Sequence, residues 1–208
     1  MPSDLMDLKA LIRDIPNFPK PGIVFKDLTP VWKDPAAFQA MVDRLASPYR
    51  ATRVAPPPAL SARGGSAGTA ADPAGLKSGG GVGIVAGIES RGLILGAALA
   101  YALGTGLVPI RKQGKLPWKT VKASYDLEYG KATTELHSDA FAPGTRVLIV
   151  DDLLATGGTA EAAVQLVREL KGEIVGLAFL VELAFLKGRE RLEKSGVEVL
   201  SLIRYDQP

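Results

Sequence analysis

Short apolar runs and longer amphipathic stretches alternate along the chain between residues 82 and 204. A run of four to eight apolar residues bounded by turn residues is typical of a buried strand, and apolar positions three and four apart are typical of a helix. These patterns predict strands over 82–86, 107–111, 124–128, 133–137, 146–150, 174–181 and 198–204. Helices are predicted over 90–103, 159–170 and 187–194, with a polar loop over 111–124. Because strands and helices alternate, we expect an α/β fold with a mostly parallel central sheet flanked by helices.

The N-terminal part of the chain lacks this alternation. Apolar residues recur at helical spacing behind Ser3 and predict a helix over 3–15. Residues 16–22 hold three prolines and a glycine, so we expect a loop there. Asp34 and Pro35 supply a capping residue followed by proline at the first helical position, which predicts a second helix ending near residue 47.

Residues 55–81 break the pattern altogether. Of these 27 residues, 22 are Ala, Gly, Pro, Ser or Thr, and no periodicity remains. Such a segment cannot bury enough apolar surface to offset the entropy lost on ordering it. We predict a flexible Ala/Gly/Pro-rich insertion within a single domain that spans residues 1–208, because neither flank could fold alone.

Composition narrows the class of protein. The chain has 208 residues, 47% of them hydrophobic, which is enough for one domain with a buried core. The absence of cysteine excludes disulfides and thiolate metal sites, and the single histidine, His137, excludes a multi-histidine centre. A net charge of +3 is a weak excess that calls for no nucleic-acid partner.

No segment has the pattern of a secretory signal or of a membrane span. The N-terminal residues carry acids among their apolar positions. Residues 92–110 are uncharged, but the sequence Gly104-Thr105-Gly106 interrupts them and Pro109 follows, which predicts a buried helix turning into a strand. We therefore expect a cytoplasmic protein without a membrane partner.

The stretch from Arg146 to Thr159 carries the chemistry. Its apolar strand delivers two adjacent carboxylates, Asp151 and Asp152, which we expect past the strand end, at the sheet edge where open α/β sheets bind ligands. The next segment, Ala155-Thr156-Gly157-Gly158-Thr159, opens into a helix, so its N–H groups, hydroxyls and helix dipole favour an anion. A phosphorylated sugar offers a phosphate to the loop and hydroxyls to the acids.

Two other nucleotide-binding motifs are absent from the chain. No Gly-Lys-Ser/Thr follows the strand, so the loop is not a Walker loop. No Gly-x-Gly-x-x-Gly is present, so the dinucleotide fingerprint is missing too. Nucleoside triphosphates and NAD are therefore poor candidate ligands.

The stretch resembles the phosphoribosyl-diphosphate signature of the type I phosphoribosyltransferases. Further segments, in the family's order, resemble its adenine-specific branch, and the resemblance covers nearly the whole chain outside 55–81. These segments are Phe18-Pro19-x-Pro21-Gly22-Ile23-Val24-Phe25-Lys26-Asp27, Glu89-Ser90-Arg91-Gly92, Ile110-Arg111-Lys112-x-Gly114-Lys115-Leu116-Pro117, Ala123-Ser124-Tyr125-x-Leu127-Glu128-Tyr129-Gly130-Lys131, and Val181-Glu182-Leu183 through Leu186-Lys187-Gly188-Arg189.

The resemblance implies a type I phosphoribosyltransferase fold with an N-terminal hood and a mobile catalytic loop over 111–124. It implies an enzyme of purine salvage that joins adenine to phosphoribosyl diphosphate, giving AMP and diphosphate. Mg²⁺ would be bound mainly through the substrate's phosphates and ribose hydroxyls, without a metal site of protein side chains. The family also implies a homodimer.

The same resemblance assigns the residues that hold phosphoribosyl diphosphate. Asp151 and Asp152 would hold the ribose hydroxyls and favour positive charge at the anomeric carbon. The 5′-phosphate would lie in the loop formed by Ala155, Thr156, Gly157, Gly158 and Thr159. Four cations are placed to neutralise the diphosphate: Arg91, Arg111, Lys112 and Lys115.

The base is expected to be selected by residues elsewhere in the chain. Ala155 stands where hypoxanthine–guanine relatives carry an aspartate, and Glu128 matches the glutamate that handles the purine proton in the adenine enzymes. Phe25 would stack on adenine, while backbone groups of Val24 and Lys26 read its polar edge.

Three alternatives stay open at this point. The base could differ, xanthine being the nearest alternative. A regulator could use this fold to sense phosphoribosyl diphosphate, although about 20 residues before the first family motif are too few for a DNA-binding winged helix. A phosphosugar-binding protein without turnover is the third, and the presence of Glu128 argues against the last two.

Overall fold

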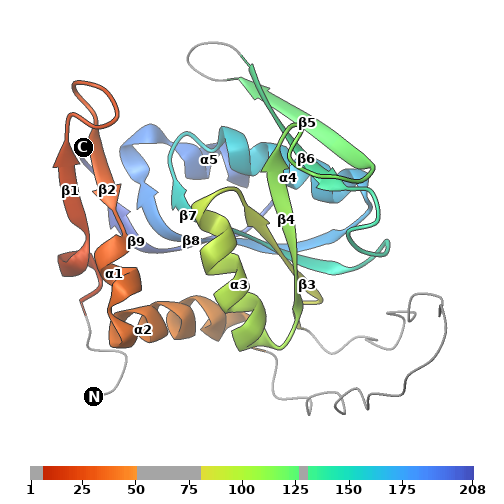
Figure 1. The fold of residues 1–208 in the computed structure, drawn as a ribbon, viewed down its shortest axis with the longest axis horizontal. Helices are drawn as coiled ribbons and strands as arrows, with labels where there is room; N and C mark the ends of the chain where they lie inside the picture. Colours follow the sequence, from red (N-terminus) through yellow and green to blue (C-terminus); the bar gives the residue numbers. More distant parts are fainter. Residues whose placement is uncertain (1–6, 51–80, 127–130) are drawn as a thin grey trace.

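The computed structural model describes residues 7–50, 81–126 and 131–208, and its centre is a seven-stranded sheet (Figure 1). The strands lie in the order β5-β6-β4-β3-β7-β8-β9, and the five from β4 to β9 are parallel. Their bounds are Ile84–Ile88 (β3), Gly106–Lys112 (β4), Arg146–Leu154 (β7), Glu173–Leu183 (β8) and Val199–Tyr205 (β9). An antiparallel hairpin, β5 (Thr120–Asp126) and β6 (Lys131–His137), extends the sheet at one edge. The expected mostly parallel sheet is confirmed.

Helices cover both faces of the sheet, because alternate residues of its central strands point into two different cores. Val147 and Ile149 pack into the core that contains α4 (Gly158–Glu169) and α5 (Gly188–Glu193). Their neighbours Leu148 and Val150 pack into the core that contains α1 (Thr29–Lys33), α2 (Pro35–Ala46) and α3 (Arg91–Leu103). Burial on both faces explains why these strands are continuous apolar runs without polar alternation.

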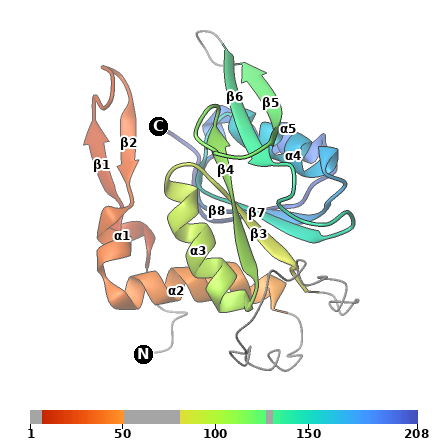
Figure 2. The same ribbon diagram turned by 45° about the vertical axis from the view of Figure 1, so that its right-hand side comes forward.

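The N-terminal part differs from the prediction of one helix over 3–15. Within the described residues it holds a 3-10 turn, η2 (Lys9–Leu11), and an antiparallel hairpin of β1 (Arg13–Pro16) and β2 (Val24–Asp27). The loop over 16–22 lies largely where it was predicted, between these strands. Arg13 pairs directly with Asp27 across the hairpin, a tertiary pairing that overrides the helical spacing. The hairpin stands apart from the main sheet in both views (Figure 1 and Figure 2).

The polar loop predicted over 111–124 is too long, and the strand predicted over 124–128 starts too late. β4 ends at Lys112 and β5 begins at Thr120, so residues 113–119 alone connect them. Val121, Ala123 and Tyr125 pack on the core, while Lys122 and Ser124 are exposed. Polar residues on the outer face of this half-buried strand gave it the composition of a loop.

Further 3-10 turns are η3 (Ser47–Tyr49) and η5 (Ala184–Leu186). Among the residues that the structure describes, no helix has both the length and the apolar character needed to cross a membrane. The predicted insertion over 55–81 lies outside the described residues except for Gly81, so its flexibility stays a prediction.

Candidate active site

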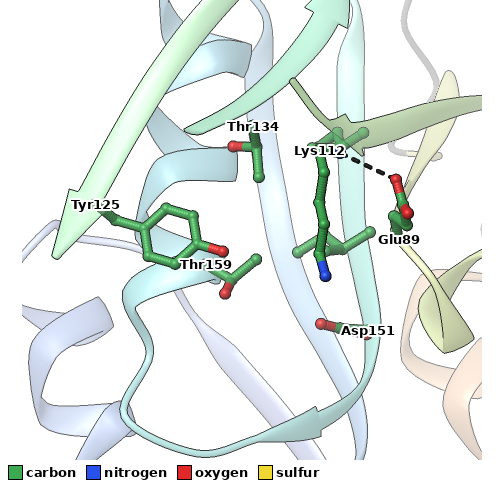
Figure 3. A pocket seen from close by; sticks show the side chains of 8 residues that line it. Glu89, Lys112, Tyr125, Thr134, Asp151 and Thr159 are labelled. Carbon is green, nitrogen blue, oxygen red and sulfur yellow. Dashed lines mark hydrogen bonds between the residues drawn. The ribbon is translucent and has the colours of Figure 1, made fainter. Parts of the chain in front are cut away.

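A cavity of about 240 Å³ opens at the carboxyl ends of β3, β4 and β7 (Figure 3). Parallel strands bring their carboxyl ends to one edge of the sheet, so residues far apart in sequence meet there. The cavity is lined by Ile88, Glu89, Ile110, Lys112, Tyr125, Thr134, Asp151 and Thr159. In Figure 3 the Lys112 ammonium group points towards Asp151. Three predicted site residues, Lys112, Asp151 and Thr159, therefore share one cavity.

The two aspartates lie within β7, which continues to Leu154, and not past the strand end as the sequence predicted. Asp151 Oδ1 accepts a hydrogen bond from the backbone N–H of Asp152 at 2.8 Å. The Asp152 side chain is only 6% exposed, and its Oδ2 lies 2.8 Å from Arg91 Nε. The strand therefore holds both carboxyl groups rigidly, and one of them faces the cavity.

Both carboxyl groups are harder to ionise than a free aspartate. Burial raises the pKa of Asp151, and the neighbouring Asp152 charge raises it further. Burial also raises the pKa of Asp152, although the Arg91 guanidinium opposes the shift. A ligand that offers positive charge or hydroxyl donors would relieve this cost, because it would replace the water that the carboxylates have lost.

The predicted phosphate loop joins β7 directly to α4. Gly157 has φ +81°, and a Cβ there would lie 2.9 Å from the carbonyl oxygen of Gly188, so glycine is required twice over. The N-cap residue of α4 is Gly157, which makes no side-chain hydrogen bond to the first turn of the helix. Thr156 is exposed and Thr159 lines the cavity. The arrangement presents open backbone donors and a hydroxyl beside the aspartates, which suits a phosphate.

Three of the four predicted diphosphate cations are already paired with carboxylates. Arg91 pairs with Asp152, while Arg111 Nε and Lys115 Nζ each lie 3.0 Å from the Glu89 carboxylate. The Lys112 side chain has no hydrogen bond or ion pair recorded among the described residues, and it points into the cavity. Lys112 is therefore the cation most available to an incoming anion.

Glu89 is a site residue to which the sequence analysis gave no role. Its side chain is 8% exposed, and it also accepts the backbone N–H of Lys112 at 3.0 Å. Burial by itself would raise its pKa, but the hydrogen bonds from Lys112, Lys115 and Arg111 lower that pKa to about 2. An acid directly after a buried strand and two residues before an arginine was the available sequence signal.

Glu135, on β6, is a second carboxylate that the sequence did not single out. It is 2% exposed and accepts the backbone N–H groups of Gly114, Lys115 and Leu116 at 2.9, 3.1 and 3.1 Å. Burial opposes its ionisation, but these N–H donors and the Thr120 hydroxyl lower its pKa. Glu135 therefore holds the base of the segment that carries Lys115.

The predicted adenine residues lie on β2, in the N-terminal hairpin. The Arg91 guanidinium lies 4.9 Å from the centre of the Phe25 ring, so Arg91 links this ring to Asp152. The Lys26 ammonium group is buried, 2.9 Å from Asp14 and 4.3 Å from the centre of the Tyr205 ring. Phe25 thus lies next to Arg91, which pairs with Asp152. The Lys26 side chain instead pairs with Asp14 on the neighbouring strand β1. Val24 is half-buried on the same strand.

Glu128, the predicted proton acceptor, lies outside the described residues. Within the described ranges, no group of three His, Cys, Asp or Glu side chains is arranged to hold a metal ion. An oxygen donor of the kind that Mg²⁺ prefers is nevertheless present, because the Asp151 carboxyl group lines the cavity.

Comparison with known proteins gives a consistent result. Residues 76–206 match the family described as the phosphoribosyl transferase domain. The adenine phosphoribosyltransferase of Solibacter usitatus is 48% identical over 201 residues, which are 97% of this chain and 99% of that protein.

Two crystal structures extend the likeness to three dimensions. The adenine phosphoribosyltransferase of Rhodothermus marinus is 44% identical, has a TM-score of 0.78, and is matched over 95% of this chain and 96% of that one. The Saccharomyces cerevisiae enzyme, solved with an imino-altritol bisphosphate and adenine, is 36% identical with a TM-score of 0.74, over 93% of this chain and 95% of that one.

Proposed function

This chain belongs to the phosphoribosyl transferase domain family, and on that premise we propose that its cavity transfers the 5-phosphoribosyl group of phosphoribosyl diphosphate to adenine. The products are AMP and diphosphate, and the reaction is a purine-salvage step. The observation that carries the proposal is that one cavity is lined by Asp151, by Thr159 at the start of α4, and by Lys112, whose side chain has no ion-pair partner among the described residues.

Three groups of described residues bind three parts of the substrate: the 5′-phosphate, the ribose hydroxyls and the diphosphate. The N–H groups and hydroxyls from Ala155 to Thr159 bind the 5′-phosphate, and the two aspartates accept hydrogen bonds from the ribose hydroxyls. Lys112 binds the diphosphate first, and Arg91, Arg111 and Lys115 follow if they leave their carboxylate partners. Each part of the ligand thus meets groups of the opposite polarity.

The transfer breaks the bond between the anomeric carbon and the diphosphate oxygen, and the diphosphate leaves with the electron pair. Adenine N9 then bonds to that carbon, and the N9 proton passes to the Glu128 carboxylate. The aspartate pair stabilises the positive charge that develops at the sugar between these events, because its own charge is fixed in a site with little water. The role of Glu128 rests on the family resemblance.

Three finer features complete the proposal. Mg²⁺ bound through the substrate's phosphates would neutralise charge on the leaving group, and Asp151, which lines the cavity, would lie beside the ribose hydroxyls. The enzyme acts in the cytoplasm. It works as a homodimer, and sedimentation at several concentrations tests this, since a fully active monomer at every concentration would contradict it.

The decisive experiment is AMP formation from adenine and phosphoribosyl diphosphate with Mg²⁺, run beside hypoxanthine, guanine and xanthine. We expect AMP from adenine and no nucleotide from hypoxanthine, guanine or xanthine. Binding of phosphoribosyl diphosphate without turnover of any base would instead indicate a sensor or a binding protein.

The proton acceptor is tested by Glu128→Gln. We expect kcat with adenine to fall by on the order of 100-fold or more, while the KM for phosphoribosyl diphosphate changes little, because the amide keeps the shape of the side chain and loses its basicity. Turnover equal to that of the parent enzyme would remove Glu128 from the mechanism.

A further inference from the structure

A partly buried ion pair at the carboxyl end of β8 takes no part in the reaction described above. Glu182, on β8, is 2% exposed, and Arg189, on α5, contacts both of its carboxylate oxygens at 2.6–3.1 Å. The guanidinium also donates to the carbonyl of Val199 at 2.7 Å and to Ser201 Oγ at 2.8 Å. Ser201 Oγ in turn donates to Glu182 at 2.5 Å. This network, Glu182–Arg189–Ser201, ties the start of α5 to β8 and β9.

The residue directly before Arg189 forms the wall behind the phosphate loop. A Cβ on Gly188 would collide with the carbonyl oxygen of Ala155 and lie 3.0 Å from the backbone nitrogen of Gly157. Conversely, a Cβ on Gly157 would lie 2.9 Å from the carbonyl oxygen of Gly188. The two backbone segments are therefore in direct contact, and the Leu154 side chain packs beside them, 2.9 Å from the Cβ position of Gly188.

The position of Gly188 depends on the network because α5 is too short to hold itself. A helix of six residues is not stable by its own hydrogen bonds, so its placement comes from its contacts. Leu192 anchors its far side in the core and Arg191 pairs with Glu161 of α4, while Arg189 fixes its first turn. A shift of Arg189 would therefore move Gly188 and, through it, the N–H groups at Gly157 and Gly158.

We propose that Glu182, Arg189 and Ser201 are positioning residues for the binding of the substrate's 5′-phosphate, acting through the contact of Gly188 with the loop from Ala155 to Gly157. They do not line the cavity and have no part in the diphosphate half of the site. The inference rests on the proposed function, because it assumes that this loop binds the 5′-phosphate. The proposal predicts that variants of these residues weaken binding of the 5′-phosphate end of the substrate and leave binding of the diphosphate end unchanged.

The experiment compares Glu182→Gln with Glu173→Gln, a matched control at the opposite end of the same strand. Glu173 also pairs with an arginine, Arg146, at 2.7 Å, but 57% of its side chain is exposed and it lies at the amino end of the sheet. Calorimetric titration uses two separate probes: ribose 5-phosphate for the phosphate loop, and inorganic diphosphate with Mg²⁺ for the cation cluster.

For Glu182→Gln we expect at least tenfold weaker binding of ribose 5-phosphate and less than a twofold change for diphosphate. In turnover, the KM for phosphoribosyl diphosphate should rise while the KM for adenine stays within twofold. Glu173→Gln should change neither probe. Equal losses for both probes, or unchanged ribose 5-phosphate binding in a folded variant, would overturn the proposal.

Two further measurements keep the outcome decisive. If Glu182→Gln fails to fold, Ser201→Ala replaces it, because this variant removes one hydroxyl from the network. It should weaken ribose 5-phosphate binding more than diphosphate binding, by a smaller factor than that expected for Glu182→Gln. If the parent enzyme binds ribose 5-phosphate but forms no AMP, the proposed function fails while the positioning role is still decided by the same titration. If the parent forms AMP but does not bind ribose 5-phosphate, the positioning role fails while the proposed function stands.

Discussion

Asp151 and Asp152 illustrate how a strand can hold charge where water would normally be needed. Burial raises the pKa of both groups, so their ionised forms are costly in the free protein. Arg91 offsets part of that cost for Asp152 at 2.8 Å. A pair of carboxyl groups that are costly to ionise, one of which faces a cavity, is typical of a site kept for its chemistry.

Replacement of either aspartate by asparagine should therefore separate activity from stability. For Asp151→Asn and Asp152→Asn we expect kcat/KM to fall at least about 100-fold, or about 2.7 kcal/mol, because the fixed negative charge at the developing cation is lost. The melting temperature should stay the same or rise, since the amide carries no charge to desolvate. Steady-state kinetics and thermal unfolding of the same preparations check this. Unfolded variants would indicate a structural role instead.

At the scale of the element, residues 113–119 are held from two sides. Glu135 accepts three successive N–H groups of the segment, and Glu89 holds the Lys115 ammonium group. The segment's own sequence, with Gly114 and Pro117, gives it little internal structure. The predicted movement over the substrates would have to break or carry along these contacts.

Limited trypsin digestion tests that movement. We expect cleavage after Lys115 or Lys119 in the free enzyme, and several-fold slower cleavage with phosphoribosyl diphosphate and Mg²⁺, because the segment closes over the ligand to exclude water. Glu135→Gln should speed cleavage of the free enzyme, since a neutral acceptor holds the N–H groups less strongly than a carboxylate. A segment resistant in both states and unaffected by the variant would contradict the prediction.

The insertion over 55–81 is a second element open to a direct test. Gly81 belongs to the ordered fold, because its carbonyl accepts a hydrogen bond from Arg146 Nε at 2.9 Å. A deletion of 55–78 therefore leaves the entry to β3 intact. We expect near-parental AMP formation and unchanged or slightly higher stability, because loop-closure entropy changes by only about 0.6 kcal/mol per doubling of length. Loss of turnover in a variant folded by circular dichroism would indicate a functional arm.

At the scale of the whole molecule, three buried carboxylates join separate parts of the sheet. Glu89 binds the segment after β4, Glu135 joins β6 to the same segment, and Glu182 joins β8 to α5 and β9. Burial acts to raise the pKa of each group, but hydrogen bonds lower it, with the help of cations at Glu89 and Glu182. In the unfolded chain these groups regain their ordinary values.

Acid should therefore weaken the fold through these groups. Between an ordinary pKa of 4.5 and the folded pKa of Glu89 of about 2, the unfolded chain binds the proton more readily, so the stability due to Glu89 is present above that window and is lost as the pH falls through it. Urea unfolding of the parent and of Glu89→Gln checks this. The difference in unfolding free energy should be constant near neutral pH and shrink below pH about 4.5; a difference independent of pH would contradict it.

The sequence by itself determined the features that depend on neighbours along the chain. The apolar runs of β3, β7 and β8 predicted a buried parallel sheet, and the residues from Asp151 to Thr159 predicted an acidic pair followed by an anion-binding helix start. Both are local, because a strand, its turn and the next helix are contiguous and each has its own residue pattern. The family likeness extended this reading to the substrates.

Only the tertiary structure decided which charges meet. Glu89 is 22 residues from Arg111, Glu135 is 21 from Gly114, and the Lys26 ammonium group lies over the ring of Tyr205 near the other end of the chain. The first two pairings follow from the strand order β6-β4-β3, which places β4 between β3 and β6, and the third from the packing of β2 near the end of β9. The β1–β2 hairpin was missed because the helical spacing of apolar residues before residue 16 does not report the cross-strand pairing of Arg13 with Asp27. The spacing of apolar residues along a strand reports which face is buried, whereas the partner of a side chain across the sheet is set by how the whole chain packs.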